Sequence, residues 1–105
     1  MLIPEINFRR DNMEYQIRRA LPEDIGPALE FALKVFMEFE APEYPPEGAE
    51  NFRSGIESKK ADPDLYFSGK RVLFAALDGD KIIGVVESKG IGHISLLFVD
   101  GAYRR

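Results

Sequence analysis

The alternation of side chains near the amino terminus predicts one strand. Between residues 13 and 20, polar residues alternate with residues that suit a half-buried face. The residues of the half-buried face are Tyr15, Ile17 and Arg19. Residues 1–12 mix isolated apolar residues with charges and show no sustained period. We therefore expect a tail at 1–12 and a folded domain at 13–105.

Helical spacing of apolar residues follows this strand. Pro22 suits the first turn of a helix, where a missing N–H breaks no hydrogen bond. The residues that recur at helical spacing are Ile25, Ala28, Leu29, Ala32, Leu33, Phe36, Met37 and Phe39. Prolines end this helix and make residues 41–46 a stiff loop. A weaker pattern predicts a second helix over about 47–60, which ends at Asp62-Pro63-Asp64.

Three β-rich runs occupy the rest of the chain, at residues 72–77, 81–87 and 93–99. Asp78-Gly79-Asp80 favours a tight hairpin between the first two, because this pair tolerates positive φ. The last two runs are apolar on both faces, as expected of strands that are covered on each side. The pattern predicts an α/β (α+β) fold with a mostly antiparallel four-stranded sheet and two helices.

Composition narrows the classes of function. The 105 residues carry a net charge of −4, with no concentrated basic face, which disfavours nucleic-acid binding. No cysteine is present, so disulfides and thiolate catalysis are excluded, and a cytoplasmic location is the default. The longest apolar runs have about six residues, whereas a membrane-spanning helix needs ~20. The amino terminus also lacks the basic start and apolar stretch of a signal peptide.

The order of these elements carries a resemblance to a known family. The run Val72-Leu73-Phe74-Ala75-Ala76-Leu77-Asp78-Gly79-Asp80-Lys81-Ile82-Ile83-Gly84-Val85-Val86 resembles the central hairpin of the GNAT superfamily of acetyl-CoA-dependent N-acetyltransferases. Ile17-Arg18-Arg19-Ala20 before Pro22-Glu23-Asp24-Ile25 is similar to its opening strand and helix start. His93-Ile94-Ser95-Leu96-Leu97-Phe98-Val99-Asp100 is similar to its fourth strand. The resemblance covers residues 13–105 and implies acetyl transfer from acetyl-CoA to an amine.

The resemblance stops before the family's cofactor loop. That loop, Q/R-x-x-G-x-G/A, opens a helix after the fourth strand and cradles the cofactor pyrophosphate. Arg104 is in place for its first basic residue, but the glycines and the helix do not follow within the 105 residues. Lys89-Gly90-Ile91-Gly92 has similar letters, yet it precedes a β-run and reads as a turn. The resemblance thus implies the amino-terminal half of such a domain, truncated and inactive alone.

The resemblance also implies positions for the cofactor. The fourth strand of the family splays from its neighbour and pairs with the pantetheine arm of acetyl-CoA. Carried over to this sequence, the backbone of Leu97, Phe98 and Val99 is the candidate cofactor site, beside Arg104. The alternative for the three strand residues is plain strand core.

Two residues are candidate bases for the acceptor amine. His93, the sole histidine, has an imidazole that takes up a proton near neutral pH, and its alternative is a solvated turn residue. Glu87 is the second candidate, because family members often use a strand carboxylate through water. Its alternative is a solvated glutamate at a strand end.

An acidic, proline-stiffened stretch is the candidate acceptor site. The family often places the acceptor amine beside the connection between the first two helices, and negative charge attracts a cation. Glu40 and Tyr44 represent this stretch, which also holds Glu38, Glu43 and Glu47. A solvated charged face is the alternative. The scattered carboxylates and one histidine have no metal-ligand spacing.

Three functions remain open from the sequence. The chain is an N-acetyltransferase, truncated at its cofactor loop, that uses acetyl-CoA and a small-molecule or peptide amine. Alternatively it is a non-catalytic module that forms a homodimer, or pairs with a complementing chain, through Leu96, Phe98 and the fourth-strand edge. The third possibility is a fold that shares only strand patterning with the family.

Overall fold

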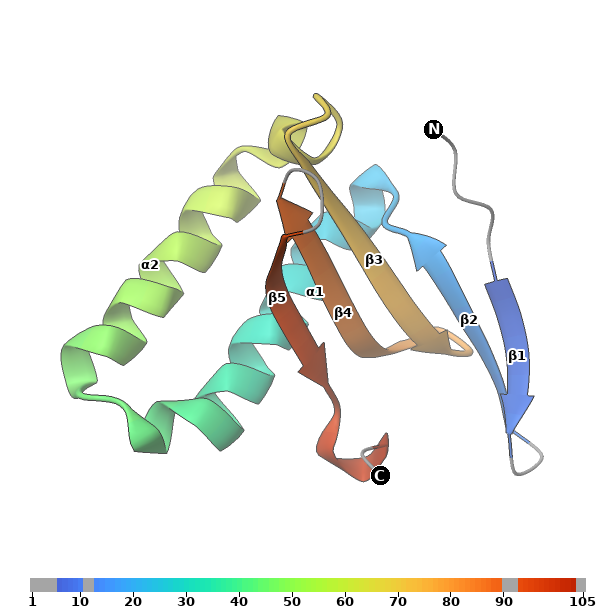
Figure 1. The fold of residues 1–105 in the computed structure, drawn as a ribbon, viewed down its shortest axis with the longest axis horizontal. Helices are drawn as coiled ribbons and strands as arrows, with labels where there is room; N and C mark the ends of the chain where they lie inside the picture. Colours follow the sequence, from blue (N-terminus) through green and yellow to red (C-terminus); the bar gives the residue numbers. More distant parts are fainter. Residues whose placement is uncertain (1–5, 11–12, 90–92, 104–105) are drawn as a thin grey trace.

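A computed structural model describes residues 6–10, 13–89 and 93–103. Its elements are one sheet and two main helices (Figure 1). The strands are β1 (Ile6–Arg10), β2 (Met13–Arg19), β3 (Arg71–Asp78), β4 (Lys81–Lys89) and β5 (Ile94–Val99). The helices are α1 (Pro22–Val35) and α2 (Pro46–Ala61), with short π or 3₁₀ segments at Phe36–Glu40, Ala41–Glu43, Pro63–Tyr66 and Gly101–Tyr103.

The sheet has the strand order β1-β2-β3-β4-β5, and every neighbouring pair is antiparallel. The predicted four strands and two helices are confirmed. The expected tail is wrong for residues 6–10, because β1 pairs with β2 and places Ile6 opposite Ile17. Ile6 and Phe8 do alternate with polar neighbours, but the run is too short to stand out without its partner strand. The other residues of the expected tail lie outside the described ranges.

The hairpin between β3 and β4 has the predicted tight turn. Asp78 lies opposite Lys81, which leaves two residues in the loop. Gly79 has a φ of +64°, the left-handed conformation that glycine adopts without a Cβ penalty. The Asp-Gly signal therefore sets this corner of the sheet.

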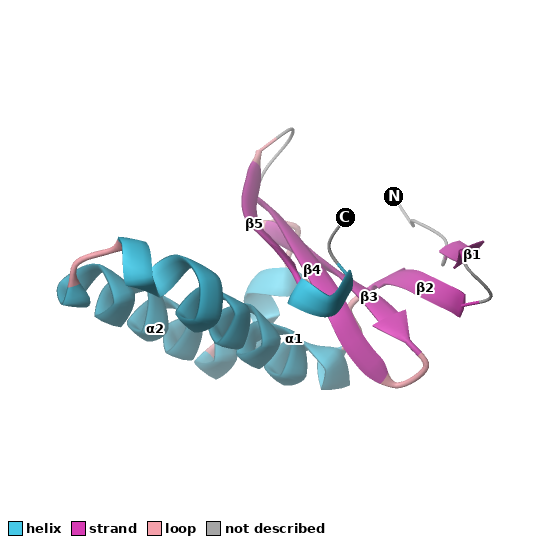
Figure 2. Cartoon of the chain, turned by 90° about the horizontal axis from the view of Figure 1, so that it is seen from below, coloured by secondary structure: helices cyan, strands magenta, loops and turns pink. Residues whose placement is uncertain are grey.

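Both helices lie on the same side of the sheet (Figure 2). The α1 stripe buries Ile25, Ala28, Leu29 and Ala32 almost completely. At its start, the Leu21 N–H donates to Asp24 Oδ2 at 2.8 Å, which caps the first turn. On the sheet, the side chains of Leu73, Val85 and Phe98 are buried against this layer. The core is thus a two-layer sandwich of helix on sheet.

The end of α1 differs from the prediction. The apolar stripe runs on to Phe39, but the α-helix ends at Val35 and residues 36–40 form a π-helical turn. Phe36 is buried, whereas Met37 and Phe39 are 38% and 40% exposed. The wider turn changes the helical phase, so the later apolar residues no longer face the core.

Candidate functional site

The outer edge of β5 is the first part of the candidate site. The Asp100 N–H donates to the Ile83 carbonyl at 2.8 Å, so these opposite residues form a hydrogen-bonded pair. Such pairs recur every second residue in an antiparallel ladder. The register then pairs Phe98 with Val85 through hydrogen bonds. It follows that the backbone groups of Leu97 and Val99 point to the outer edge, while those of Phe98 point to β4.

A series of aromatic rings joins the helical layer to this strand. The rings of Phe36 and Phe52 stack with centroids 4.0 Å apart, and Phe52 meets Phe98 edge to face at 5.8 Å. Tyr44 stacks on Phe36 at 5.5 Å and is 52% exposed. The rings lead from the surface at Tyr44 to Phe98 near the carboxyl end of β5, so the candidate acceptor stretch and the candidate cofactor strand are packed together.

A second contact holds the α1–α2 connection to the end of β5. A Cβ atom built on Gly101 would lie 2.7 Å from Cζ of Phe39, so the ring occupies the space that a side chain would need. A side chain at this position would need the Phe39 ring, which is 40% exposed, to move aside. The carboxylates of the same connection all belong to exposed residues, and they are Glu38, Glu40, Glu43 and Glu47. The stretch therefore presents negative charge beside the end of β5.

Glu87 lies in the predicted strand, but it is not solvated. It is fully buried, with 0% exposure, on the helix side of β4, so the interpretation as a solvated strand-end glutamate is wrong. Oε1 accepts hydrogen bonds from Arg71 Nη1 at 2.8 Å and Lys59 Nζ at 3.1 Å, and Oε2 accepts one from the Tyr66 hydroxyl. Burial of a carboxylate requires such donors. We call Glu87, Tyr66, Arg71 and Lys59 the Glu87 cluster.

No pattern in the sequence indicates the partners of Glu87. They come from the end of α2, the turn at Pro63–Tyr66 and the first residue of β3, which are far apart in the chain. Each is an ordinary surface-type residue in its local pattern. Only the tertiary fold brings the two cations and the phenol to one carboxylate.

The buried Tyr66 makes a pH-dependent contribution to stability. Burial and then the hydrogen bond and negative charge of Glu87 raise the pKa of Tyr66 well above its ordinary value, and Arg71 opposes this shift. A folded-state pKa above the unfolded one gives stability that is present below about pH 10 and lost as the pH rises above it.

We expect the free energy of unfolding to fall between about pH 9 and about pH 11, and to fall less in Tyr66→Phe. Denaturant titrations of both proteins across this range measure the difference. The other tyrosines are common to both and cancel in the comparison. Equal pH slopes in the two proteins would contradict the buried, protonated phenol.

The remaining candidate residues lie in two kinds of place. His93 is exposed, and its carbonyl accepts a hydrogen bond from the Lys89 N–H at 2.8 Å, at the opposite end of β5 from Val99. Arg104 lies outside the described residues, as do residues 90–92 of the glycine turn. The structure thus brings Leu97, Val99 and Tyr44 to one end of the domain and His93 to the other end of β5.

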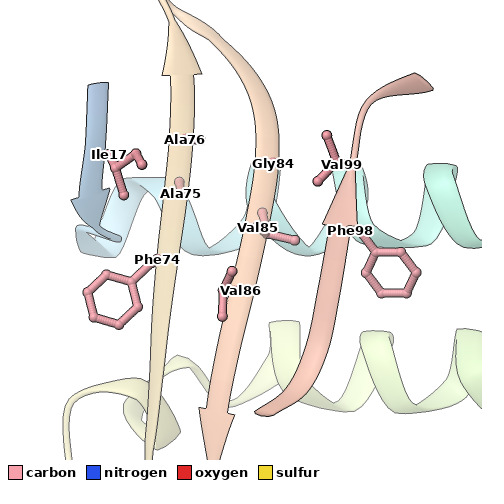
Figure 3. A pocket seen from close by; sticks show the side chains of 9 residues that line it. All are labelled: Ile17, Phe74, Ala75, Ala76, Gly84, Val85, Val86, Phe98 and Val99. Carbon is pink, nitrogen blue, oxygen red and sulfur yellow. The ribbon is translucent and has the colours of Figure 1, made fainter. Parts of the chain in front are cut away.

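The face of the sheet opposite the helices is apolar and hollowed (Figure 3). A hollow of about 130 Å³ lies over the small residues Ala76 and Gly84. Apolar side chains on neighbouring strands border it on this face, namely Ile17, Phe74, Val86 and Val99. Neither α1 nor α2 covers this face (Figure 2). The strands that read as apolar on both sides are therefore covered by helix on one side only, as far as the described residues extend.

The described ranges contain no group of three or more His, Cys, Asp or Glu side chains arranged to hold a metal ion. They also contain no helix of the length and apolar character needed to cross a bilayer.

Comparisons with known proteins agree with this geometry. Residues 40–105 match the family described as "Acetyltransferase (GNAT) domain". The PaiA N-acetyltransferase from Thermoplasma acidophilum, solved in complex with coenzyme A, superposes with a TM-score of 0.70 at 21% identity, over 89% of this chain and 63% of that one. A possible acetyltransferase from Clostridium difficile 630 superposes with a TM-score of 0.54 at 19% identity, over 87% and 60%. No curated protein matches the sequence. The chain spans less than two thirds of the length of each of these two solved structures.

Proposed function

Because the chain belongs to the GNAT family of acetyltransferases, we propose that it forms part of an enzyme that transfers acetyl from acetyl-CoA to an amine. The observation that carries the proposal is the outer edge of β5. The Leu97 backbone is directed to that edge, and the aromatic contacts hold the Tyr44 stretch beside the same strand. An extended cofactor arm and an acceptor amine would then meet at one end of the sheet.

Each part of this site has a distinct task in the proposed reaction. Acetyl-CoA, when bound, supplies an acetyl group activated as a thioester. The backbone of Leu97 and Val99 would hold its arm, and the exposed Glu40 carboxylate would draw a cationic amine to the surface beside Tyr44. The amine must lose a proton before it attacks. Neither candidate base is placed for this step, because Glu87 is fully buried and His93 lies at the opposite end of β5 from Val99.

We further propose that the 105 residues do not bind acetyl-CoA alone. The sequence from Val99 to Arg105 holds no Q/R-x-x-G-x-G/A loop, so the pyrophosphate would lack its backbone donors. The edge of β5 supplies contacts to the arm only. The cysteine-free sequence also supports our proposal of a cytoplasmic location.

Calorimetry tests the proposal with two proteins. Titration of acetyl-CoA into the 105-residue chain should give no saturable heat. The same chain, joined after Arg105 to the part of the Thermoplasma acidophilum protein that the match leaves uncovered, should bind acetyl-CoA saturably and release free thiol when amines are added. A folded fusion that does not bind acetyl-CoA would overturn the proposed cofactor edge. Saturable binding by the 105 residues alone would contradict the proposal that they do not bind acetyl-CoA by themselves.

The hollowed face of the sheet favours a second candidate function. A contiguous apolar face on a small domain favours association, because it leaves surface that water solvates poorly. The chain would then be a non-catalytic module that forms a homodimer, or pairs with a complementing chain, over this face and the outer edge of β5. Leu96 and Phe98, the residues expected at this edge from the sequence, are instead buried on the helix side. Sedimentation of the calorimetry sample separates the cases. A compact monomer at micromolar concentration would exclude the proposed homodimer.

A further inference from the structure

A change of register in β5 lies directly opposite Glu87. Leu96 faces Glu87, but Ile94 faces Ser88, so Ser95 is an extra residue with no opposite partner in β4. This is a β-bulge, which bends a strand and redirects its backbone groups. The bulge thus coincides with the residue that holds the buried carboxylate.

The extra residue decides which backbone groups reach the outer edge. On the amino-terminal side of the bulge, the Lys89 N–H donates to the His93 carbonyl. The backbone groups of His93 therefore point to β4. If the backbone groups alternated without interruption from His93, those of Leu97 and Val99 would point to β4 as well. The bulge shifts the alternation by one residue, and Leu97 is directed outward instead. The candidate cofactor edge therefore depends on the bulge staying at Ser95.

The same shift decides which residues face the helices. Leu96 and Phe98 are buried on the helix side, at 8% and 9% exposure. A strand without the bulge would turn Leu96 and Phe98 away from that side and Val99 toward it, because a slip of one residue exchanges the two faces. Ser95 would then stand opposite the buried carboxylate in place of Leu96.

The Glu87 cluster fixes the strand beside the bulge. Glu87 is held from three directions, by Lys59 at the end of α2, Tyr66 in the following turn and Arg71 at the start of β3. A carboxylate with no exposure tolerates little movement, because any shift would leave its charge without donors. The β4 backbone at Glu87 is thereby anchored to three elements, directly opposite Leu96 of β5.

We propose that Glu87 is a positioning residue, which keeps the β5 bulge at Ser95 and so directs the Leu97 backbone to the cofactor edge. The inference deepens the proposed function and rests on it. Glu87 acts through the register of β5 and touches no substrate. Its role is to decide which amides the edge presents.

Amide hydrogen exchange, measured residue by residue by NMR on the 105-residue chain, tests this role. Glu87→Gln keeps the shape of the side chain and removes the charge. We expect the Leu96 and Phe98 amides to lose protection by about tenfold relative to the Leu73 and Ala75 amides of β3. The matched control is Ile56→Val in α2, which weakens the same core away from the bulge. It should lower protection across the sheet without singling out β5.

The outcomes separate the role from general stability. Uniform loss in Glu87→Gln, as in the control, or an unchanged pattern would overturn the proposal. If Glu87→Gln does not fold, Lys59→Met decides, because it removes one donor and leaves Arg71 and Tyr66 in place. It should give the same selective loss to a smaller extent, and a uniform loss would overturn the proposal. The exchange needs no cofactor, so failed acetyl-CoA binding by the fusion would overturn the proposed function and leave the register result standing.

Discussion

Glu87→Ala should lower the free energy of unfolding by about 3 to 5 kcal/mol, the range for removing one partner of a buried ion pair. The substitution leaves Lys59, Arg71 and the Tyr66 hydroxyl without their common acceptor. The side chains of Lys59 and Arg71 are 19% and 21% exposed, so water compensates part of the loss and favours the lower end of the range. Denaturant unfolding monitored by circular dichroism measures the change.

Glu30 provides the matched control. It is also a glutamate paired with a lysine, Lys60, but its side chain is 51% exposed. Glu30→Ala should change stability by less than about 1 kcal/mol, as is usual for a surface ion pair. If the two alanine variants are equally mild, the Glu87 cluster does not hold the fold together as described.

Phe98→Ala should cost about 3 to 5 kcal/mol, the range for removing a large buried aromatic side chain. The ring is 9% exposed and packs edge to face on Phe52, which itself stacks on Phe36. Its loss leaves a cavity between β5 and the helical layer. Thermal and denaturant unfolding of the variant measure the cost.

Two variants make the comparison decisive. Phe98→Leu keeps most of the apolar volume and should cost less than about 1.5 kcal/mol. Phe67→Ala removes a phenylalanine that is 45% exposed, and it should change stability by roughly 0.5 kcal/mol or less. Equal costs for Phe98→Ala and Phe98→Leu would show that the ring contacts with α2 contribute little.

Local patterns in the sequence were enough for most of the fold. The Asp78-Gly79-Asp80 turn carries its own backbone preference, and the hairpin formed where predicted. The second helix was predicted within one residue at each end, despite its two glycines. These features depend on neighbours in the sequence, which is why they can be read there.

Features that depend on distant partners could not be read in this way. The strand at Ile6–Arg10 needs β2 beside it, and its own alternation is brief. The π-helical turn at Phe36–Glu40 changes the phase of a stripe that looks continuous in the sequence. The sequence pattern therefore predicts a first α-helix that is too long and does not predict the strand at Ile6–Arg10.

The same distinction between local patterns and distant partners applies to the candidate site. The resemblance pointed to Leu97, Phe98 and Val99 as one group, but strand pairing separates Phe98 from the other two. The burial of Glu87 required Lys59, Tyr66 and Arg71, and no spacing in the sequence relates them. Chemistry that needs three distant donors becomes visible only once the chain is folded.

The pairing of β2 with β3 has a consequence for how the chain folds. The β3–β4 and β4–β5 pairs join neighbouring segments, whereas Arg19 of β2 lies opposite Phe74 of β3, with both helices between them in the sequence. Closing that long loop costs more chain entropy than closing either hairpin. We therefore expect the β3–β4–β5 meander to form early, and β2 to dock late, after α1 and α2 have packed on it. The slow step of folding would then be the pairing of β2 with β3, which completes the sheet beside its two helices.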